Sequence, residues 1–173
     1  QGVTVTCPGT TLAPGESKER ELTWFDWSVP AVISRDGRTI LFTESGEGGG
    51  AGYSVYLRKT DGSPAVRLGE GNAQDISPDG QWVLALQNPA EPKLVAYPTG
   101  AGEIQRFPMD KAIVISANFT PDGKRIFFTA IEEGHGPRIY LRDFAGGAPR
   151  ALTPERYSSS GLVSPDGTRI AVR

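Results

Sequence analysis

The chain has 173 residues, 38% of them hydrophobic and 22% charged, a balance typical of a globular domain and not of a disordered one. Its formal net charge of −2 provides no basic field for nucleic acid or anionic lipid, while its one cysteine and one histidine exclude an internal disulfide and argue against a zinc site. The 22 glycines and 14 prolines favour a turn-rich all-β fold, and we expect no cofactor.

A four-residue turn recurs along the chain after two short predicted strands, Val3–Thr6 and Arg20–Thr23. The spacings from glycine to glycine are 43, 43 and 44 residues, a period typical of the four-stranded blades of a β-propeller. In a type I turn, serine suits the first position, proline pre-sets φ at the second and glycine supplies positive φ at the fourth, so Gly80 and Gly123 are predicted to have positive φ. The copies occupy residues 34–37, 77–80, 120–123 and 164–167, and the residues to which we assign a structural role in these turns are Asp36, Gly37, Pro78, Asp79, Gly80, Pro121, Asp122, Gly123, Pro165, Asp166 and Gly167.

Three further kinds of segment recur with the turn and complete the blade. A continuous apolar strand follows each turn, as expected for a strand with both faces buried between neighbouring blades: Ile40–Phe42, Val83–Leu86, Ile126–Phe128 and Ile170–Val172. A third strand comes next, over Ser54–Arg58, Lys93–Tyr97 and Arg138–Arg142. After a turn that contains Gly62, Gly100 or the pair Gly146–Gly147, a short outer strand closes the blade over Ala65–Leu68, Glu103–Phe107 and Pro149–Leu152.

The predicted fold is all-β, a β-propeller fragment of four-stranded antiparallel blades over residues 1–173, with about three complete blades and partial blades at both ends. The complete blades begin near Val29, Asn72 and Val114, and a fourth begins near Ser160 with its two inner strands alone. The competing fold, an ordinary β-sandwich, has no reason to repeat at a fixed period near 43 residues. We expect the inner strands side by side around one axis, over Ala31–Ile33, Ala73–Ile76, Ala117–Phe119 and Leu162–Val163.

The two ends of the chain leave a choice between an open arc and a closed ring. Val3–Thr6 and Arg20–Thr23, separated by a long connection, are interpreted as outer strands of a partial blade that precedes the first complete one. In the less favoured alternative they supply the third and outer strands of the fourth blade and close a ring of four. The open arc leaves Thr168–Val172 with an unpaired edge, so it predicts self-association through open blade edges.

Residues 138–172 carry a recognisable order of features: an Ile-Tyr-Leu-Arg strand, a Gly-Gly turn, a short Leu-Thr strand and then Ser-Pro-Asp-Gly. In this order the chain resembles the WD-like repeats of TolB and of prolyl-oligopeptidase-type propellers, and the resemblance covers almost the whole chain. It implies a propeller of a bacterial protein and, for a TolB-like protein, a periplasmic or extracytoplasmic location.

A narrower resemblance rests on three segments, Glu19–Ser28, Leu41–Gly50 and Tyr56–Gly69. They look like segments of the propellers at the C-terminal end of bacterial Ser/Thr protein kinases and related signalling proteins. The kinase domain itself is not in this sequence, because residues 143–146 do not form its Asp-Phe-Gly motif and no His-Arg-Asp loop is present.

The sequence contains no recognisable set of catalytic or metal-binding residues. His135 lies in a predicted loop and no Gly-x-Ser-x-Gly elbow is present, so it is interpreted as a solvated loop histidine. The glycine-rich segment Glu44–Gly52 lacks the glycine spacing of a phosphate-binding loop and is interpreted as a flexible hairpin on one rim. The four turn aspartates are each a whole blade apart, so they cannot converge on one calcium ion.

Trp24, Asp26 and Trp27 are the candidates for ligand binding, because aromatic residues at a propeller rim can form a binding surface. They can also fill the junction between two blades, and this packing role is the favoured interpretation.

Two functions of different classes are compatible with these features. The first is a non-catalytic scaffold for protein or ligand binding or sensing, within a larger bacterial signalling or TolB-like protein. The second is the propeller domain of a prolyl-oligopeptidase-type serine peptidase, with its hydrolase domain outside this sequence. We expect a protein or peptide partner, no nucleic acid and no catalysis by this chain, in which no apolar run approaches the roughly 20 residues of a membrane span.

Overall fold

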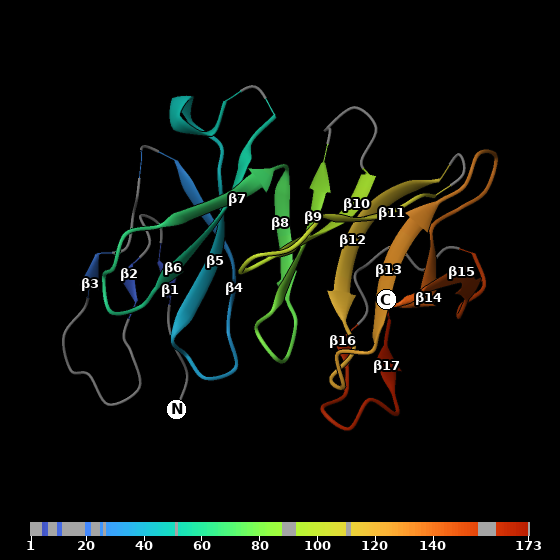
Figure 1. Cartoon of the computed structure of the whole chain (residues 1–173). Coiled ribbons are helices and arrows are strands. Elements are labelled where there is room, and N and C mark those ends of the chain that lie inside the picture. The colour runs from blue at the N-terminus through green and yellow to red at the C-terminus, as the bar shows by residue number, and fades with distance from the viewer. Residues whose placement is uncertain are drawn as a thin grey trace.

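The computed structural model describes residues 5–6, 10–11, 20–21, 25, 27–50, 52–87, 93–109, 112–155 and 162–172, and strands dominate it (Figure 1). Three antiparallel sheets of four strands follow one another along the chain, and we call them blades 1, 2 and 3. Blade 1 consists of β4 (Ser28–Ile33), β5 (Thr39–Glu44), β6 (Ser54–Lys59) and β7 (Val66–Glu70). Blade 2 consists of β8 (Asn72–Ile76), β9 (Trp82–Gln87), β10 (Lys93–Pro98) and β11 (Gln105–Phe107). Blade 3 consists of β12 (Ile113–Phe119), β13 (Arg125–Ile131), β14 (Arg138–Asp143) and β15 (Gly146–Ala151).

The strands of each blade are hydrogen-bonded to one another in chain order, from an inner to an outer strand. This arrangement confirms the predicted all-β propeller architecture. The repeated turn joins the inner strand to the second strand, and its glycine N–H donates to the carbonyl of the first turn residue at 2.8 Å in all four copies. Gly80 and Gly123 have φ values of 71° and 70°, so the predicted positive φ is also confirmed.

Two hydrophobic clusters fill the space between the blades. One joins Leu41 and Val55 of blade 1 to Val83 and Ala85 of blade 2. The other joins Leu84 and Leu86 of blade 2 to residues of blade 3 that include Val114, Ile126 and Phe128. Because successive residues of β9 enter opposite clusters, this strand is buried on both faces, which is why its apolar run is continuous and not alternating.

The inner strands lie next to one another and are tied together by side chains. The Ala73 N–H of β8 donates to Thr43 Oγ1 of blade 1 at 2.9 Å. The Phe119 N–H of β12 donates to Asp75 Oδ2 of β8 at 2.8 Å, and the Ala117 N–H donates to Gln74 Oε1 at 3.3 Å. The three complete blades therefore fan outward from adjacent inner strands, as predicted, and do not form two facing sheets (Figure 1).

Two details of the predicted elements are wrong. Gly146 and Gly147 do not form the turn between the last two strands of blade 3, because both belong to β15; the two residues between β14 and β15 are Phe144 and Ala145. The expected long connection between the first two strands holds a strand of its own, β2 (Thr10–Thr11).

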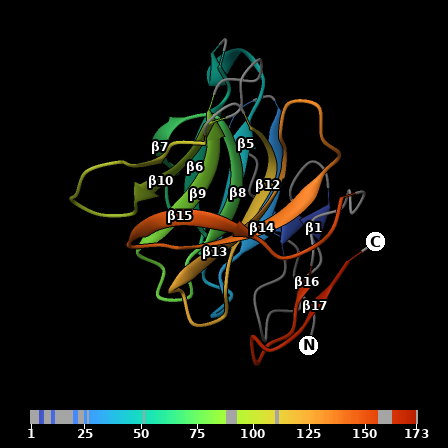
Figure 2. The same ribbon diagram turned by 90° about the vertical axis from the view of Figure 1, so that its right-hand side faces the viewer.

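The two ends of the chain form separate small sheets. At the N-terminal end, β1 (Val5–Thr6), β2 and β3 (Arg20–Glu21) pair in a three-stranded sheet. At the C-terminal end, β16 (Leu162–Val163) and β17 (Ile170–Ala171) pair as a hairpin. The two sheets lie at opposite sides of Figure 1, and Figure 2 shows the hairpin below blade 3. The described strands therefore do not show the alternative in which the N-terminal strands complete the fourth blade.

The helical structure of the described part of the chain is the short 3-10 turn η1 (Glu47–Gly49) between β5 and β6. None of the described residues forms a helix with the length and apolar character needed to span a membrane.

Candidate functional site

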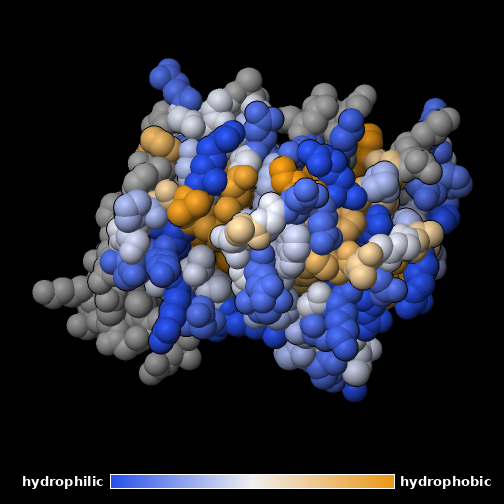
Figure 3. All heavy atoms as spheres, in the orientation of Figure 1, coloured by the Kyte–Doolittle hydropathy of each residue, from blue (hydrophilic) through white to orange (hydrophobic). Residues whose placement is uncertain are grey.

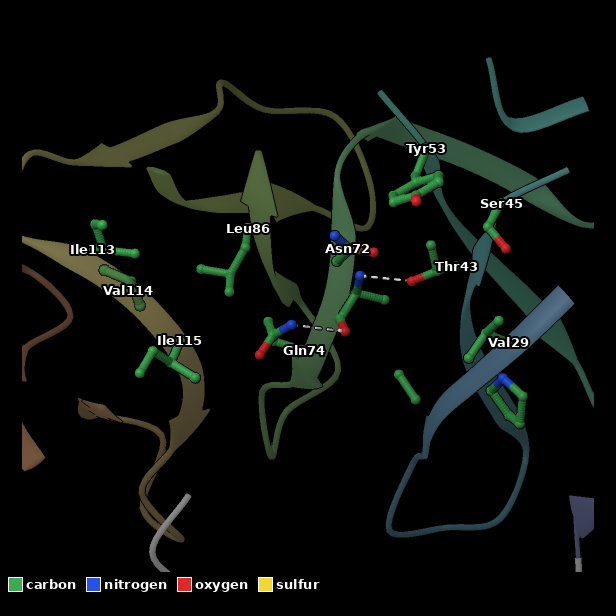
Figure 4. A pocket seen from close by; sticks show the side chains of 13 residues that line it. Val29, Thr43, Ser45, Tyr53, Asn72, Gln74, Leu86, Ile113, Val114 and Ile115 are labelled. Carbon is green, nitrogen blue, oxygen red and sulfur yellow. Dashed lines mark hydrogen bonds between the residues drawn. The ribbon is translucent and has the colours of Figure 1, made fainter. Parts of the chain in front are cut away.

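An open groove of about 670 Å³ lies where the inner strands of the three blades begin (Figure 4). We call this the axial groove. Its apolar lining comes from Val29, Pro30, Ala31, Ala73, Leu86, Ile113, Val114 and Ile115. Its polar lining comes from Thr43, Ser45, Tyr53, Asn72 and Gln74, so none of the described residues that line it is charged.

Strand alternation explains why large apolar side chains remain exposed at the groove. Successive side chains of a strand point to opposite faces, so Ser28 and Val114 are buried while their neighbours Val29, Ile113 and Ile115 face outward. These three outward side chains are 43 to 50% exposed. They project from β4 and β12 on the two sides of the groove, with β8 between them (Figure 4). The groove therefore offers apolar contact area that the described residues leave uncovered.

The polar side chains of the groove divide into those that hold the blades together and those that do not. Gln74 accepts the Ala117 N–H and joins two inner strands, while Thr43 of β5 accepts the Ala73 N–H and joins the second strand of blade 1 to the inner strand of blade 2. Tyr53 lies at the rim with φ of 58°, a left-handed conformation that is uncommon for residues other than glycine, asparagine and aspartate. The Gly71 N–H donates a hydrogen bond to the Tyr53 carbonyl at 3.2 Å. Strained backbone of this kind is concentrated at ligand-binding sites, so the conformation of Tyr53 supports a binding role for the groove.

An exposed tryptophan lies beside the groove, and hydrogen bonds fix its backbone. The side chain of Trp27 is 66% exposed, and its backbone N–H donates to Glu44 Oε1 at 2.9 Å. The Glu44 carboxylate is fully buried and also accepts a hydrogen bond from Ser28 Oγ at 2.7 Å. The Ser45 N–H donates to the Trp27 carbonyl at 3.0 Å, which places Trp27 at the same rim as the loop between β5 and β6.

The residues that precede Trp27 differ in their placement. Phe25 is half-exposed, packs edge-on against Tyr56 at 5.9 Å between ring centroids, and covers Gly48 of the glycine-rich loop. Trp24 and Asp26 lie outside the described residues. Because most of the Trp27 side chain is exposed, packing between two blades does not account for it. Its role in binding stays a prediction.

His135 lies in the loop between β13 and β14 and is half-exposed, as the sequence predicts for a solvated loop histidine. Its Nδ1 lies 2.8 Å from Glu155 Oε1, and Arg138 Nη2 lies 2.6 Å from the same oxygen. The hydrogen bond with His135, the Gly136 N–H and Arg138 lower the pKa of Glu155 to about 2. This arrangement ties the loop to the segment after β15. Glu155 was missed in the sequence because it is 20 residues away from His135.

Each turn aspartate is held within its own turn. Asp79 Oδ1 accepts hydrogen bonds from Ser77 Oγ at 2.5 Å and from the Gln81 N–H at 3.0 Å, and these bonds lower the pKa of Asp79. The same pattern recurs at the other copies of the turn, at Asp36, Asp122 and Asp166.

The blades and the axial groove define a class of protein, the β-propellers with four-stranded antiparallel blades. No protein-family model matches the chain. Over 79 residues, 46% of this chain, it is 33% identical to the Tol-Pal system protein TolB of Anaeromyxobacter dehalogenans strain 2CP-C. The crystal structure of TolB from Acinetobacter baumannii superposes on 92% of the chain with a TM-score of 0.71 and 22% identity. A putative TolB from Agrobacterium tumefaciens superposes on 94% of it with a TM-score of 0.72 and 17% identity. The chain is thus a TolB-like β-propeller.

The chain spans only part of each of these proteins. The match covers 18% of the Anaeromyxobacter protein, 40% of the Acinetobacter structure and 61% of the Agrobacterium structure. A prolyl endopeptidase structure also superposes on 83% of the chain, with a lower TM-score of 0.60 and 14% identity, over 26% of its own length. At that identity the likeness shows a shared fold alone.

Proposed function

We propose that this chain is a non-catalytic propeller scaffold that binds a protein or peptide partner in the axial groove. The observation that carries the proposal is the groove's lining, uncharged over the described residues, where Val29, Ile113 and Ile115 expose large apolar side chains between three blades. Exposed apolar surface framed by polar residues is typical of interaction sites. The likeness to TolB, a protein named for the Tol-Pal system, supports the same interpretation.

The alternative is the propeller domain of a prolyl-oligopeptidase-type serine peptidase. The similarity to a prolyl endopeptidase supports it, although that similarity concerns the fold alone. The sequence of a longer parent protein discriminates between the two functions. A Gly-x-Ser-x-Gly elbow downstream favours the peptidase, whereas a kinase domain and a membrane span upstream favour a signalling protein.

We also propose an extracytoplasmic location, on the strength of the TolB likeness. Attachment to a bacterial Ser/Thr kinase stays a prediction. The location can be tested by fusing the parent protein to a reporter enzyme that is active only outside the cytoplasm. We expect the fusion to be active.

The binding proposal can be tested with peptides selected from a random library on the immobilised chain. Ile113→Glu places a charge in the groove at a half-exposed position, where it should leave folding intact. Val66→Glu is the matched control, because Val66 is 59% exposed on the outer strand β7. We expect Ile113→Glu to weaken binding by about tenfold or more, as expected for a charge in an apolar site, and Val66→Glu to have little effect.

Two results would count against the scaffold. Equal binding by both variants would show that the groove is not the binding site. Cleavage of the selected peptides, detected by mass spectrometry and lost on His135→Ala, would show that the chain is an enzyme.

A further inference from the structure

The end of the propeller that holds the axial groove is rich in glutamate. The connections at this end include the loop from β5 to β6, the link from β7 to β8, the loop from β13 to β14 and the segment after β15. The loops from β9 to β10 and from β11 to β12 also lie at this end, and their residues 88–92 and 110–111 are outside the described part of the chain. Among the described residues, these connections contain Glu47, Glu70, Glu132, Glu133 and Glu155. The described cations at this end are Lys93, which begins β10, Arg138, which is already bound to Glu155, and Arg67, whose Nε donates to Ser54 Oγ at 3.0 Å at the start of β6. Over the part of the chain that the structure describes, the charge at this end is therefore predominantly negative.

Two of these glutamates lie directly beside the groove. Glu47 is exposed, two residues after the groove residue Ser45. Glu70 is exposed, two residues before the groove residue Asn72, and its carboxylate lies against Gly52 in the loop that carries Tyr53. The ion pairs of the described residues join other groups, and neither Glu47 nor Glu70 takes part in one.

Trp27 adds a third feature that suits a cation. Its exposed ring lies two residues before Val29, which lines the groove, and its carbonyl is bonded to Ser45. The face of an exposed tryptophan ring attracts a Lys or Arg side chain. The rim thus combines negative charge and an aromatic face around an uncharged apolar groove.

The opposite end of the blades lacks this bias. Its turns carry both signs of charge close together, with Arg35, Asp36 and Arg38 in the first turn and Asp122, Lys124 and Arg125 in the third. The acidic character is therefore a property of the groove end and not of the whole chain. Figure 3 shows apolar surface in the upper half of the molecule, set among hydrophilic residues.

We propose that the partner presents an extended basic peptide segment, in which an apolar side chain enters the axial groove and flanking Lys or Arg residues meet Glu47, Glu70 and Trp27. This inference rests on the proposed binding function and names the chemistry of its partner. Complementary charge speeds encounter and disfavours acidic partners, while the groove provides the apolar contact. Because Glu47 and Glu70 are exposed, salt weakens their contribution.

The test uses three synthetic peptides with one apolar core, Ile-Leu-Val, flanked on both sides by two Lys, two Ser or two Glu residues. Fluorescence anisotropy measures their binding to the chain at low and at high salt. We expect the Lys-flanked peptide to bind about tenfold more tightly than the Ser-flanked one at low salt, with the advantage shrinking at high salt. The Glu-flanked peptide should bind most weakly.

Variants of the chain assign the advantage to the named residues. The single variants Glu47→Gln and Glu70→Gln should each reduce the Lys advantage, the double variant should remove most of it, and Trp27→Ala should reduce it further. Glu103→Gln is the matched control, because Glu103 is an exposed glutamate in the turn between β10 and β11, at the other end of the blade. It should leave the Lys advantage unchanged.

The outcomes separate this inference from the proposed function. If the Ser-flanked and Lys-flanked peptides bind equally and both lose affinity with Ile113→Glu, the groove binds peptides but the basic partner is wrong. If Glu103→Gln lowers the Lys advantage as much as Glu47→Gln or Glu70→Gln alone does, the effect is one of net charge and the inference is also wrong. If no peptide responds to Ile113→Glu, the proposed function and this inference both fail.

Discussion

The repeated turn is closed by side chains as well as by backbone. In the second copy, Ser77 Oγ donates to Asp79 and accepts the Trp82 N–H at 2.9 Å, at the start of β9. Thr120 makes the same two kinds of bond in the third copy, which explains why threonine replaces serine there. The aspartate is therefore part of the turn itself. Because the pKa of Asp79 is lowered in the folded chain, its contribution to stability is present above the ordinary value of 3.8 and is lost as the pH falls.

At the scale of single residues, we predict that Gly80→Val lowers the free energy of unfolding by about 1–2 kcal/mol, because a β-branched residue disfavours the left-handed backbone. The position isolates this effect, since φ is 71° and a β-carbon would meet no atom within 4 Å. Urea denaturation followed by tryptophan fluorescence measures the change.

Gly100→Val is the matched control for this prediction. Gly100 also has open space around it, but its φ lies outside the left-handed range. The control should change stability less than Gly80→Val does. An unchanged midpoint for Gly80→Val would show that the account of the turn is wrong.

At the scale of strands and turns, neighbouring blades touch through the repeated turn. A β-carbon on Gly123 would lie 3.2 Å from Pro78 Cδ of the preceding blade, and one on Gly167 would lie 3.7 Å from Pro121 Cδ. In the first copy Arg35 replaces the proline, and a β-carbon on Gly80, the glycine of the next copy, would have no atom within 4 Å. The proline thus contributes contact between blades in addition to its local effect on φ.

Asp75 joins the inner strands of blades 2 and 3. It is largely buried, and its carboxylate accepts the N–H groups of Ile76 and Phe119. The equivalent positions, five residues before the turn glycine, hold Val32 in blade 1 and Asn118 in blade 3. Burial raises the pKa of Asp75 despite these hydrogen bonds. The ionised form of Asp75 is therefore the less stable one in the folded chain. The contribution of Asp75 to the free energy of unfolding falls as the pH rises through its raised pKa.

We predict that Asp75→Ala lowers the free energy of unfolding by about 2 kcal/mol, because it leaves the buried Phe119 N–H without an acceptor. Asp75→Asn keeps an acceptor and removes the charge, so it should cost less and should flatten the pH dependence above 3.8. Denaturation of the three proteins at several pH values between 4 and 8 measures both effects. Equal losses for the two variants would contradict the hydrogen-bond role.

At the scale of the whole molecule, the described strands form an arc with an open edge. β17 pairs with β16 on one side, and no described strand pairs with its other side. An exposed strand edge recruits other strands, so we predict that the chain self-associates. Ala171→Lys, at an exposed position in β17, should reduce this association because edge lysines oppose strand pairing.

Light scattering of the purified chain measures the association. Ala101→Lys is the matched control, because it adds the same charge at an exposed position between β10 and β11. A compact monomer in which Ile170 and Ala171 are protected from hydrogen exchange would contradict the open arc.

The candidate site was only partly accessible from the sequence. Trp27 was identified as a rim residue, since aromatic residues just before an inner strand are visible as a local pattern. Val29, Ile113 and Ile115 were not identified as a group, because they are spread over two blades and look like ordinary strand residues. The sequence likewise predicts Glu44 within a loop, whereas it ends β5 and its buried carboxylate accepts the Trp27 N–H.

The sequence alone determined the blade and its turn, because the glycine φ depends on neighbouring residues, and the turn and the apolar second strand recur with a period of 43 that needs no structure to be seen. The tertiary structure decided what lies between blades. The Asp75 link, the proline contacts and the axial groove join residues about one blade apart, and neither spacing nor composition shows which side chains meet across that distance. The apolar groove and its acidic rim therefore became visible only when the blades were placed side by side.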